Sequence, residues 1–382
     1  MPVSPSYDVF CRVVDHFGDA GICWRLARQL AREHGFAVTL WIDDRAVLAR
    51  IAPVLDARCD DQIRSGVRVR RLAAPMPEDA KPADVVIEGF GCGVPEPYLA
   101  AMAARAHAPV WINLEYLSAE AWIETSHGLP SPNPRLPLTR WFFFPGFTNR
   151  TGGLLREHDL LATRDAALVP AEDSTVRSPE DGGAPAEVLT VSLYCYPNSA
   201  LPALFDVWSE GDKRIVCNIP DCVARSELDR WLGGNVPHQG TPIERGRLTL
   251  IVHPFVAQDS FDRRLWSSDV NFVRGEDSFV RAQWAARPFI WHIYPQAAAA
   301  HAAKLEAFLA RYTSGLHGVS AAAVRDFWRA FNAGDGAATA TAWPSLRASL
   351  PVLSTHGRAW ASALAQQSDL ATRLVNFAAS RL

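Results

Sequence analysis

The sequence lacks the features of a secreted, membrane-spanning or disulfide-stabilised protein. Its seven cysteines form no C-x-x-C pair, and their odd number in mostly apolar surroundings favours buried thiols over a disulfide framework or a zinc site. No stretch approaches the run of about 20 apolar residues that a membrane-spanning helix needs. The first ten residues, MPVSPSYDVF, have neither the basic region nor the apolar core of a secretory signal. We therefore expect a cytoplasmic protein that has no membrane partner.

An excess of positive charge is also missing. The formal net charge is −3 at pH 7, so the chain carries no basic footprint for a nucleic-acid partner. The P-loop and the G-x-S-x-G motif are absent, which argues against the common NTPases and hydrolases. What is present is a chain of 382 residues with 48% hydrophobic residues, enough for two or three domains with sizeable cores.

Short apolar runs alternate with helical patterns in two successive α/β halves. In the first half we expect strands at Val9–Val14, Val38–Ile42, Val67–Leu72, Asp84–Phe90, Val110–Glu115 and Trp141–Phe144. In the second half we expect them at Val188–Tyr194, Arg214–Asn218, Leu248–Phe255, Asp269–Arg274 and Phe289–Tyr294. Strands that alternate with helices form parallel sheets with both faces covered.

The composition also predicts where the domains begin and end. Residues 168–187 are rich in Pro, Gly, Ser and acidic side chains, and we interpret them as a solvated linker. The predicted domains are residues 1–167 and 188–353, facing each other across a cleft that the carboxyl ends of the strands border. The helical tail, residues 354–382, is expected to pack against one of the halves, with the first as the main candidate.

The turn DHFGDAG joins the first strand to a helix whose apolar stripe starts at Cys23. Asp15 and Asp19 are expected to face the cleft, and Gly18 and Gly21 allow a positive φ or the close approach of a ligand. Taken alone, the turn is explained more simply by Asp19 as a helix cap and Asp15 as a turn former. The absence of G-x-G-x-x-G disfavours a dinucleotide site. A magnesium site would need a third ligand that the sequence does not offer, so we expect no metal.

A second turn, R-G-E-D-S from Arg274 to Ser278, occupies the corresponding position in the second half. Free amides at a helix start bind a diphosphate, and an arginine there stabilises the charge of a diphosphate leaving group. A third stretch, SLYCYPNS, places Tyr194 and Tyr196 on one face of an extended segment, and Phe255 ends another strand. These rings suit either core packing or the stacking of a nucleobase.

Together these stretches resemble the EarP family, the arginine rhamnosyltransferases of bacterial elongation factor P. The resemblance rests on DHFGDAGICWRLARQLA, NLEYLSAEAWIETSHGLPSP, FFFPGFTNRTGGLLRE, SLYCYPN and PFVAQDSFDRRLWSSDVNFVRGEDSFVRAQWAARPFIWHIYPQ, which follow one another along nearly the whole chain. It implies a GT-B architecture of two Rossmann-like domains, dTDP-β-L-rhamnose as donor without a metal or other cofactor, and inversion at the anomeric carbon. The implied acceptor is an arginine side chain of elongation factor P.

The resemblance also assigns residues. The implied catalytic carboxylates are Asp15, Asp19 and Glu276. The implied donor-binding residues are Tyr194, Tyr196, Phe255, Gln258, Arg274, Asp277, Ser278 and Tyr294, to which we add Gly18 for the close approach that it allows. Two positions depart from the family pattern, His16 in place of asparagine and Tyr194 in place of phenylalanine. Neither removes a carboxylate or an aromatic face, so they affect only the expected donor affinity.

A mechanism follows as a hypothesis. Because a guanidinium has a pKa above about 12, we expect Asp19 to align one nitrogen and to take its proton only as the bond to the sugar forms. Asp15 supports that arrangement, and Glu276 orients the donor. Two alternatives stay open at this point: an inverting GT-B enzyme with another donor or acceptor, and a non-catalytic nucleotide-sugar sensor.

Overall fold

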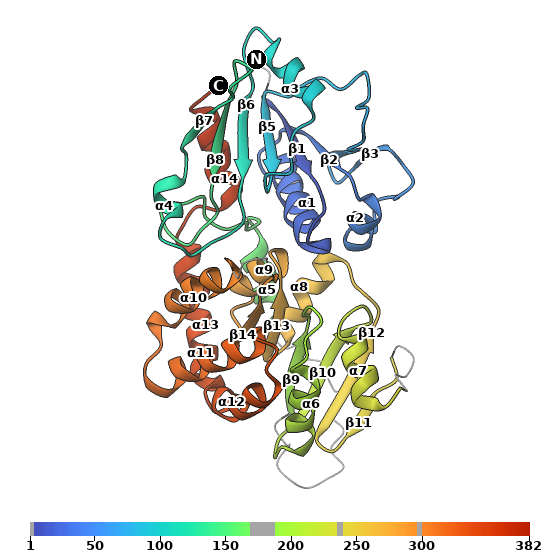
Figure 1. The fold of residues 1–382 in the computed structure, drawn as a ribbon, viewed down its shortest axis with the longest axis vertical. Helices are drawn as coiled ribbons and strands as arrows, with labels where there is room; N and C mark the ends of the chain where they lie inside the picture. Colours follow the sequence, from blue (N-terminus) through green and yellow to red (C-terminus); the bar gives the residue numbers. More distant parts are fainter. Residues whose placement is uncertain (1–3, 169–187, 235–239, 296–299) are drawn as a thin grey trace. The chain divides into compact units, whose positions relative to one another are not determined.

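A computed structural model describes residues 4–168, 188–234, 240–295 and 300–382 of the chain. The expected linker lies outside these residues, apart from Leu168. The chain divides into two compact units, Met1–His158 with Ala363–Leu382, and Asp159–Ser362 (Figure 1). Among the described residues, no helix combines the length and apolar character needed to span a bilayer.

The first unit contains a sheet with the strand order β3-β4-β2-β1-β5-β6-β8-β7. Its strands are β1 (Ser6–Cys11), β2 (Ala37–Ile42), β3 (Asp61–Arg64), β4 (Val67–Arg71), β5 (Val85–Gly89), β6 (Val110–Leu114), β7 (Pro130–Pro132) and β8 (Thr139–Phe143). The inner strands are parallel, and each edge strand, β3 and β7, pairs antiparallel with its neighbour. β1, β5 and β6 are almost completely buried, as expected for a parallel sheet with helices on both faces.

The second unit repeats this design with the strand order β11-β12-β10-β9-β13-β14. Its strands are β9 (Val188–Leu193), β10 (Arg214–Pro220), β11 (Ile243–Arg245), β12 (Leu248–His253), β13 (Val270–Arg274) and β14 (Phe289–His292). Among the described strands of this sheet, only the edge strand β11 pairs antiparallel.

Helices connect the strands and cover the sheets. In the first unit they are α1 (His16–Arg32), α2 (Arg45–Ile51), α3 (Glu96–Ala103), α4 (Ile123–Ser126) and α14 (Leu370–Ala379). In the second they are α5 (Leu160–Leu168), α6 (Leu201–Glu210), α7 (Arg225–Leu232), α8 (Gln258–Ser267), α9 (Asp277–Ala285), α10 (Ala300–Tyr312), the 3₁₀ helix η2 (Thr313–Gly315), α11 (Gly318–Asn332) and α12 (Gly336–Ala348). Helix α13 (Leu350–Ala365) contains the boundary at Ser362, after which the chain belongs to the first unit again.

Each sheet has a point at which the direction of chain travel reverses. In the first unit the chain adds β2 and β4 on one side of β1, then continues with β5 on the other side. In the second unit β10 and β12 lie on one side of β9, and β13 lies on the other. Ligands of open parallel sheets bind where two such strands end and their connections diverge. The carboxyl ends of β1 and β5, and those of β9 and β13, are therefore the places to examine.

The structure corrects the sequence analysis around the first turn. Helix α1 begins at His16 rather than near Cys23, so Gly18 and Gly21 lie inside the helix, and the positive φ belongs to His16, at 32°. Two side chains of this helix that its apolar stripe turns outward, Arg25 and Gln29, are instead buried, at 1% and 2% exposure. The stripe missed them because distant polar groups of the same unit cover this face of the helix.

Candidate functional site

The acidic turn lies at the carboxyl end of β1, where helix α1 begins. Asp19 has no exposed surface, and its Oδ2 accepts hydrogen bonds from the backbone amides of Val14 and Asp15, both at 2.9 Å. Its Oδ1 accepts from the Tyr116 hydroxyl at 3.0 Å. Asp15 is the N-cap residue of α1 and is 7% exposed, and its carbonyl accepts from the Gly18 amide at 2.7 Å. The turn is thus held by the Asp19 carboxylate, but not as the simpler interpretation has it, because Asp19 lies inside the helix and the N-cap residue is Asp15.

Arg274 stands at the corresponding position of the second unit, at the end of β13. Its guanidinium lies over the rings of Tyr194 and Tyr196, 4.5 and 4.8 Å from their centroids. It donates to the Cys195 carbonyl at 3.2 Å and to the Tyr194 hydroxyl at 3.4 Å. The two tyrosines do share one face of the chain after β9, and that face holds a cation. These four contacts hold the Arg274 guanidinium in place.

Helix α9 starts directly after Arg274. The Ser278 hydroxyl accepts from the Arg274 amide at 2.9 Å and donates back to its carbonyl, which closes the turn. Asp277 is buried and accepts from the Gln258 amide group of α8 at 3.0 Å. Glu276 is the N-cap residue of α9 and is 6% exposed, without a side-chain capping bond. Two carboxylates therefore stand at this helix start beside an arginine.

A chain of aromatic rings extends from Tyr196. Its ring meets those of His292 and Tyr294 edge-on, each with centroids 5.4 Å apart. Burial, and secondly the nearby charge of Arg274, lower the pKa of His292 to about 4, so this imidazole is neutral at physiological pH. Tyr294 is 38% exposed and Phe255 is half-buried after β12.

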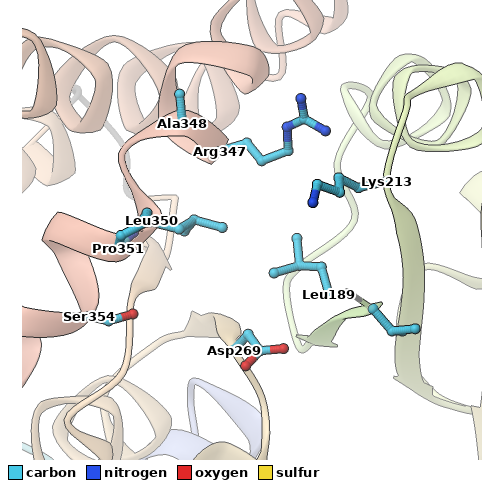
Figure 2. A pocket seen from close by; sticks show the side chains of 9 residues that line it. Leu189, Lys213, Asp269, Arg347, Ala348, Leu350, Pro351 and Ser354 are labelled. Atoms are coloured by element: carbon cyan, nitrogen blue, oxygen red, sulfur yellow. The ribbon is translucent and has the colours of Figure 1, made fainter. Parts of the chain in front are cut away.

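A pocket of about 540 Å³ opens beside the amino ends of strands in the second sheet, opposite to the ends described above (Figure 2). It is lined at the amino ends of strands by Val188, Leu189, Lys213 and Asp269, with residues 347–354 opposite them. In Figure 2, Lys213 and Arg347 extend into it from opposite sides. The predicted donor-binding residues all follow carboxyl ends of strands, so this pocket is not their site. Over the described part of the chain, no group of three His, Cys, Asp or Glu side chains is arranged to hold a metal.

The structure thus assembles the predicted residues into two groups, one in each unit. The first unit brings Asp15, Asp19 and Gly18 together. The second brings together, near the ends of β9 and β13, the residues Tyr194, Tyr196, Gln258, Arg274, Asp277 and Ser278. Glu276 lies in the same turn, between Arg274 and Asp277 in the sequence. Sequence reasoning missed Tyr116, which the turn after β6 delivers to Asp19. Its position directly after the predicted strand Val110–Glu115 was the available signal.

Two Rossmann-like units of this topology are characteristic of the GT-B fold, the fold of many glycosyltransferases. The calicheamicin glycosyltransferase CalG4 shares that fold, with a TM-score of 0.51 at 13% identity over the full length of both chains. The family model described as Elongation-Factor P (EF-P) rhamnosyltransferase EarP matches residues 7–379. The chain belongs to the EarP family.

Individual members of this family are similar over their whole length. Proteins named protein-arginine rhamnosyltransferase from Pseudomonas putida and Pseudomonas aeruginosa are 48% and 45% identical to this chain. The alignments cover 97% and 99% of this chain and 98% and 100% of the relatives. A solved structure, described as the structural basis for EarP-mediated arginine glycosylation of elongation factor EF-P, has a TM-score of 0.68 at 35% identity, covering 99% of this chain and 100% of its own.

Proposed function

We propose that this chain is a cytoplasmic enzyme that transfers rhamnose from dTDP-β-L-rhamnose to an arginine side chain of elongation factor P, with inversion. Full-length similarity to proteins named protein-arginine rhamnosyltransferase supports the activity. The observation that carries the chemistry is the set of groups at the two switch points. The first unit offers carboxylates for a cationic acceptor, and the second offers, beside the carboxylates of Glu276 and Asp277, an arginine and a helix start for an anionic donor.

The donor side follows from the contacts of Arg274. When the bond between sugar and diphosphate breaks, negative charge grows on the diphosphate, and a preorganised guanidinium stabilises it without rearrangement. The amides at the start of α9 add to this stabilisation. Because Arg274 supplies the positive charge, the reaction needs no metal ion. The buried Gln258 has an Oε1 without a hydrogen-bond partner in the described residues, which suits a donor hydroxyl or amide.

The acceptor side depends on Asp15 and Asp19. A carboxylate oxygen accepts two hydrogen bonds, so Oδ2 of Asp19 is saturated by its two amides, whereas Oδ1 retains one position beside Tyr116. We assign that position to the guanidinium nitrogen that attacks the sugar. The nitrogen reaches it once the groups that cover Asp19 have moved, and gives up its proton as the new bond forms. Asp15 shares the positive charge, and Glu276 orients the donor.

Intact-mass analysis tests this proposal directly. The purified chain is incubated with dTDP-β-L-rhamnose and elongation factor P, and a single deoxyhexose increment on the acceptor is expected. Replacing the acceptor arginine by lysine in elongation factor P serves as the control and is expected to abolish the increment. NMR of the product then gives the anomeric configuration, which inversion predicts to be α. Donor binding without any mass increase would refute the proposal in favour of a sensor, and transfer only from another nucleotide sugar would refute the donor assignment.

A further inference from the structure

Tyr116 contacts the carboxylate oxygen of the buried Asp19 that accepts the fewer hydrogen bonds. Its hydroxyl donates to Oδ1 at 3.0 Å, while the two backbone amides fill Oδ2. The two amides hold only Oδ2, so the carboxylate group could still rotate about the bond that joins it to the side chain. The hydrogen bond from the Tyr116 hydroxyl to Oδ1 opposes that rotation and so sets the direction in which Oδ1 can accept a second hydrogen bond.

The Tyr116 ring is itself held in place by Phe90. The two rings are stacked, with centroids 4.3 Å apart and planes inclined by 11°. Phe90 is the first residue after β5, and Tyr116 is the second after β6, so the pair is built from the ends of two neighbouring strands. One of these strands, β5, also borders the switch point beside β1.

The loop that presents Phe90 is constrained at several points. Phe90 has φ 57°, a left-handed conformation that bulky residues seldom adopt and that tends to be retained at functional sites. Its amide donates to the Leu114 carbonyl at 2.7 Å, and the Gly91 amide donates to Asn113 Oδ1 at 3.0 Å. Further along the loop, the buried Glu88 carboxylate accepts from the Gly93 amide at 2.9 Å. These contacts make the aromatic pair a rigid support.

We propose that Tyr116 is a positioning residue for transfer: it holds Oδ1 of Asp19 in the direction from which that oxygen receives the acceptor nitrogen and its proton. This inference rests on the proposed function, because it needs Asp19 to contact the acceptor. A purely structural role for Tyr116 has a different signature. Loss of a structural hydrogen bond lowers stability and leaves the turnover of each folded molecule unchanged, whereas loss of positioning lowers kcat.

The test variant is Tyr116→Phe, which removes the hydroxyl and keeps the ring stacked on Phe90. We expect kcat to fall by about 10-fold or more, because small misplacements of a reacting group are costly. KM for elongation factor P and the Kd for dTDP-rhamnose stay unchanged. Tyr98→Phe is the matched control, since the Tyr98 hydroxyl donates to the buried carboxylate of Asp8 in the same unit, away from the turn. It is expected to lower the melting temperature and to leave kcat unchanged.

A second variant keeps the inference testable if the first folds poorly. Phe90→Leu retains the hydroxyl and removes its stacking partner, and it is expected to lose part of kcat with the same KM. Unchanged kcat in Tyr116→Phe, or a rise in KM alone, overturns the positioning role. If the unmodified chain fails to add rhamnose to elongation factor P, the proposed function itself fails.

Discussion

Replacing Asp19 by asparagine removes a negative charge and keeps the size of the side chain, so it separates the chemical role of the carboxylate from its structural one. The amide oxygen can take over the position of Oδ2 and accept from the amides of Val14 and Asp15. The amide nitrogen then faces the Tyr116 hydroxyl, which can rotate to accept from it. All three hydrogen bonds therefore survive in neutral form.

The expected cost in stability follows from those three bonds. A hydrogen bond to a charged group contributes about 1.5–3 kcal/mol and a neutral one about 0.5–1.5 kcal/mol, so each loses roughly 1 kcal/mol and the variant about 3 kcal/mol. For a unit of this size that corresponds to a decrease of roughly 6–12 °C in Tm. Turnover should fall further, by about 10²–10⁴-fold, because the proton acceptor is gone.

Three measurements on Asp19→Asn decide between the roles. Calorimetric scanning gives Tm, titration with dTDP-rhamnose gives the donor Kd, and intact-mass kinetics give turnover of elongation factor P. Donor affinity is expected to stay normal, because all proposed donor-binding residues except Gly18 belong to the other unit. Asp19→Ala serves as the comparison, since it leaves two amides without an acceptor and should cost about 2–6 kcal/mol. Near-normal turnover in Asp19→Asn together with a lower Tm would show that Asp19 only caps the turn.

Three further predictions concern the second unit. Arg274→Lys keeps the positive charge and loses the planar guanidinium, so the single-turnover rate of transfer should fall by about 100-fold. An unchanged rate would show that Arg274 does not stabilise the leaving group. Asp262→Asn breaks the buried pair with Arg281 (2.8 and 3.0 Å) and should cost about 3–5 kcal/mol with normal turnover per folded molecule, measured by denaturant titration. A cost below about 1 kcal/mol would refute the expected penalty for leaving the Arg281 charge buried and unpaired. Because the pKa of His292 is lowered from 6.5 to about 4, the folded state loses about 3 kcal/mol as pH falls from 6.5 to 4, and His292→Gln should abolish this part of the pH dependence. Identical pH profiles for both proteins would contradict it.

Most inner strands of both sheets were predictable because the majority of their residues are apolar. Val85–Gly89 and Val110–Leu114, for example, differ by one residue at each end at most from the expected runs. The edge strands β3, β7 and β11 were not predicted. Each has only three or four residues and no apolar run (DQIR, PSP and IER), and exists only because a neighbouring strand offers free hydrogen-bonding groups.

Helix α1 shows where a local pattern stops being informative. Its apolar stripe was identified correctly, but the polar face is covered as well. Gln29 donates to the Arg156 carbonyl at 2.8 Å and to Asp369 at 3.2 Å, and Arg25 pairs with Glu157 at 3.4 Å. These partners lie more than 120 positions along the chain, where periodicity carries no information about them.

The candidate site likewise contains residues that a local pattern locates and residues that depend on distant contacts. Residues at strand ends, such as Asp15 and Arg274, could be located from the sequence because parallel strands present their carboxyl ends together. Their catalytic and donor-binding roles came from family resemblance and remain predictions. Tyr116 and Phe90 could not be found, because their contribution depends on two loops that meet only after β5 and β6 have paired.

The tyrosines after β9 show how a correct placement can carry an incomplete interpretation. Alternation along the chain predicts that Tyr194 and Tyr196 share one face. The sequence favours for these rings either core packing or stacking on a nucleobase. In the structure that face holds the Arg274 guanidinium, so the rings first serve to hold a cation, the one that we propose to contact the diphosphate. This arrangement gives a structural role to the hydroxyl of Tyr194, which stands where the family pattern has phenylalanine. The Tyr194 hydroxyl accepts from Arg274 at 3.4 Å, which a phenylalanine cannot do, while the ring face that binds the cation is the same in both. The substitution therefore adds one hydrogen bond to Arg274 and leaves its cation–π contact with the ring in place.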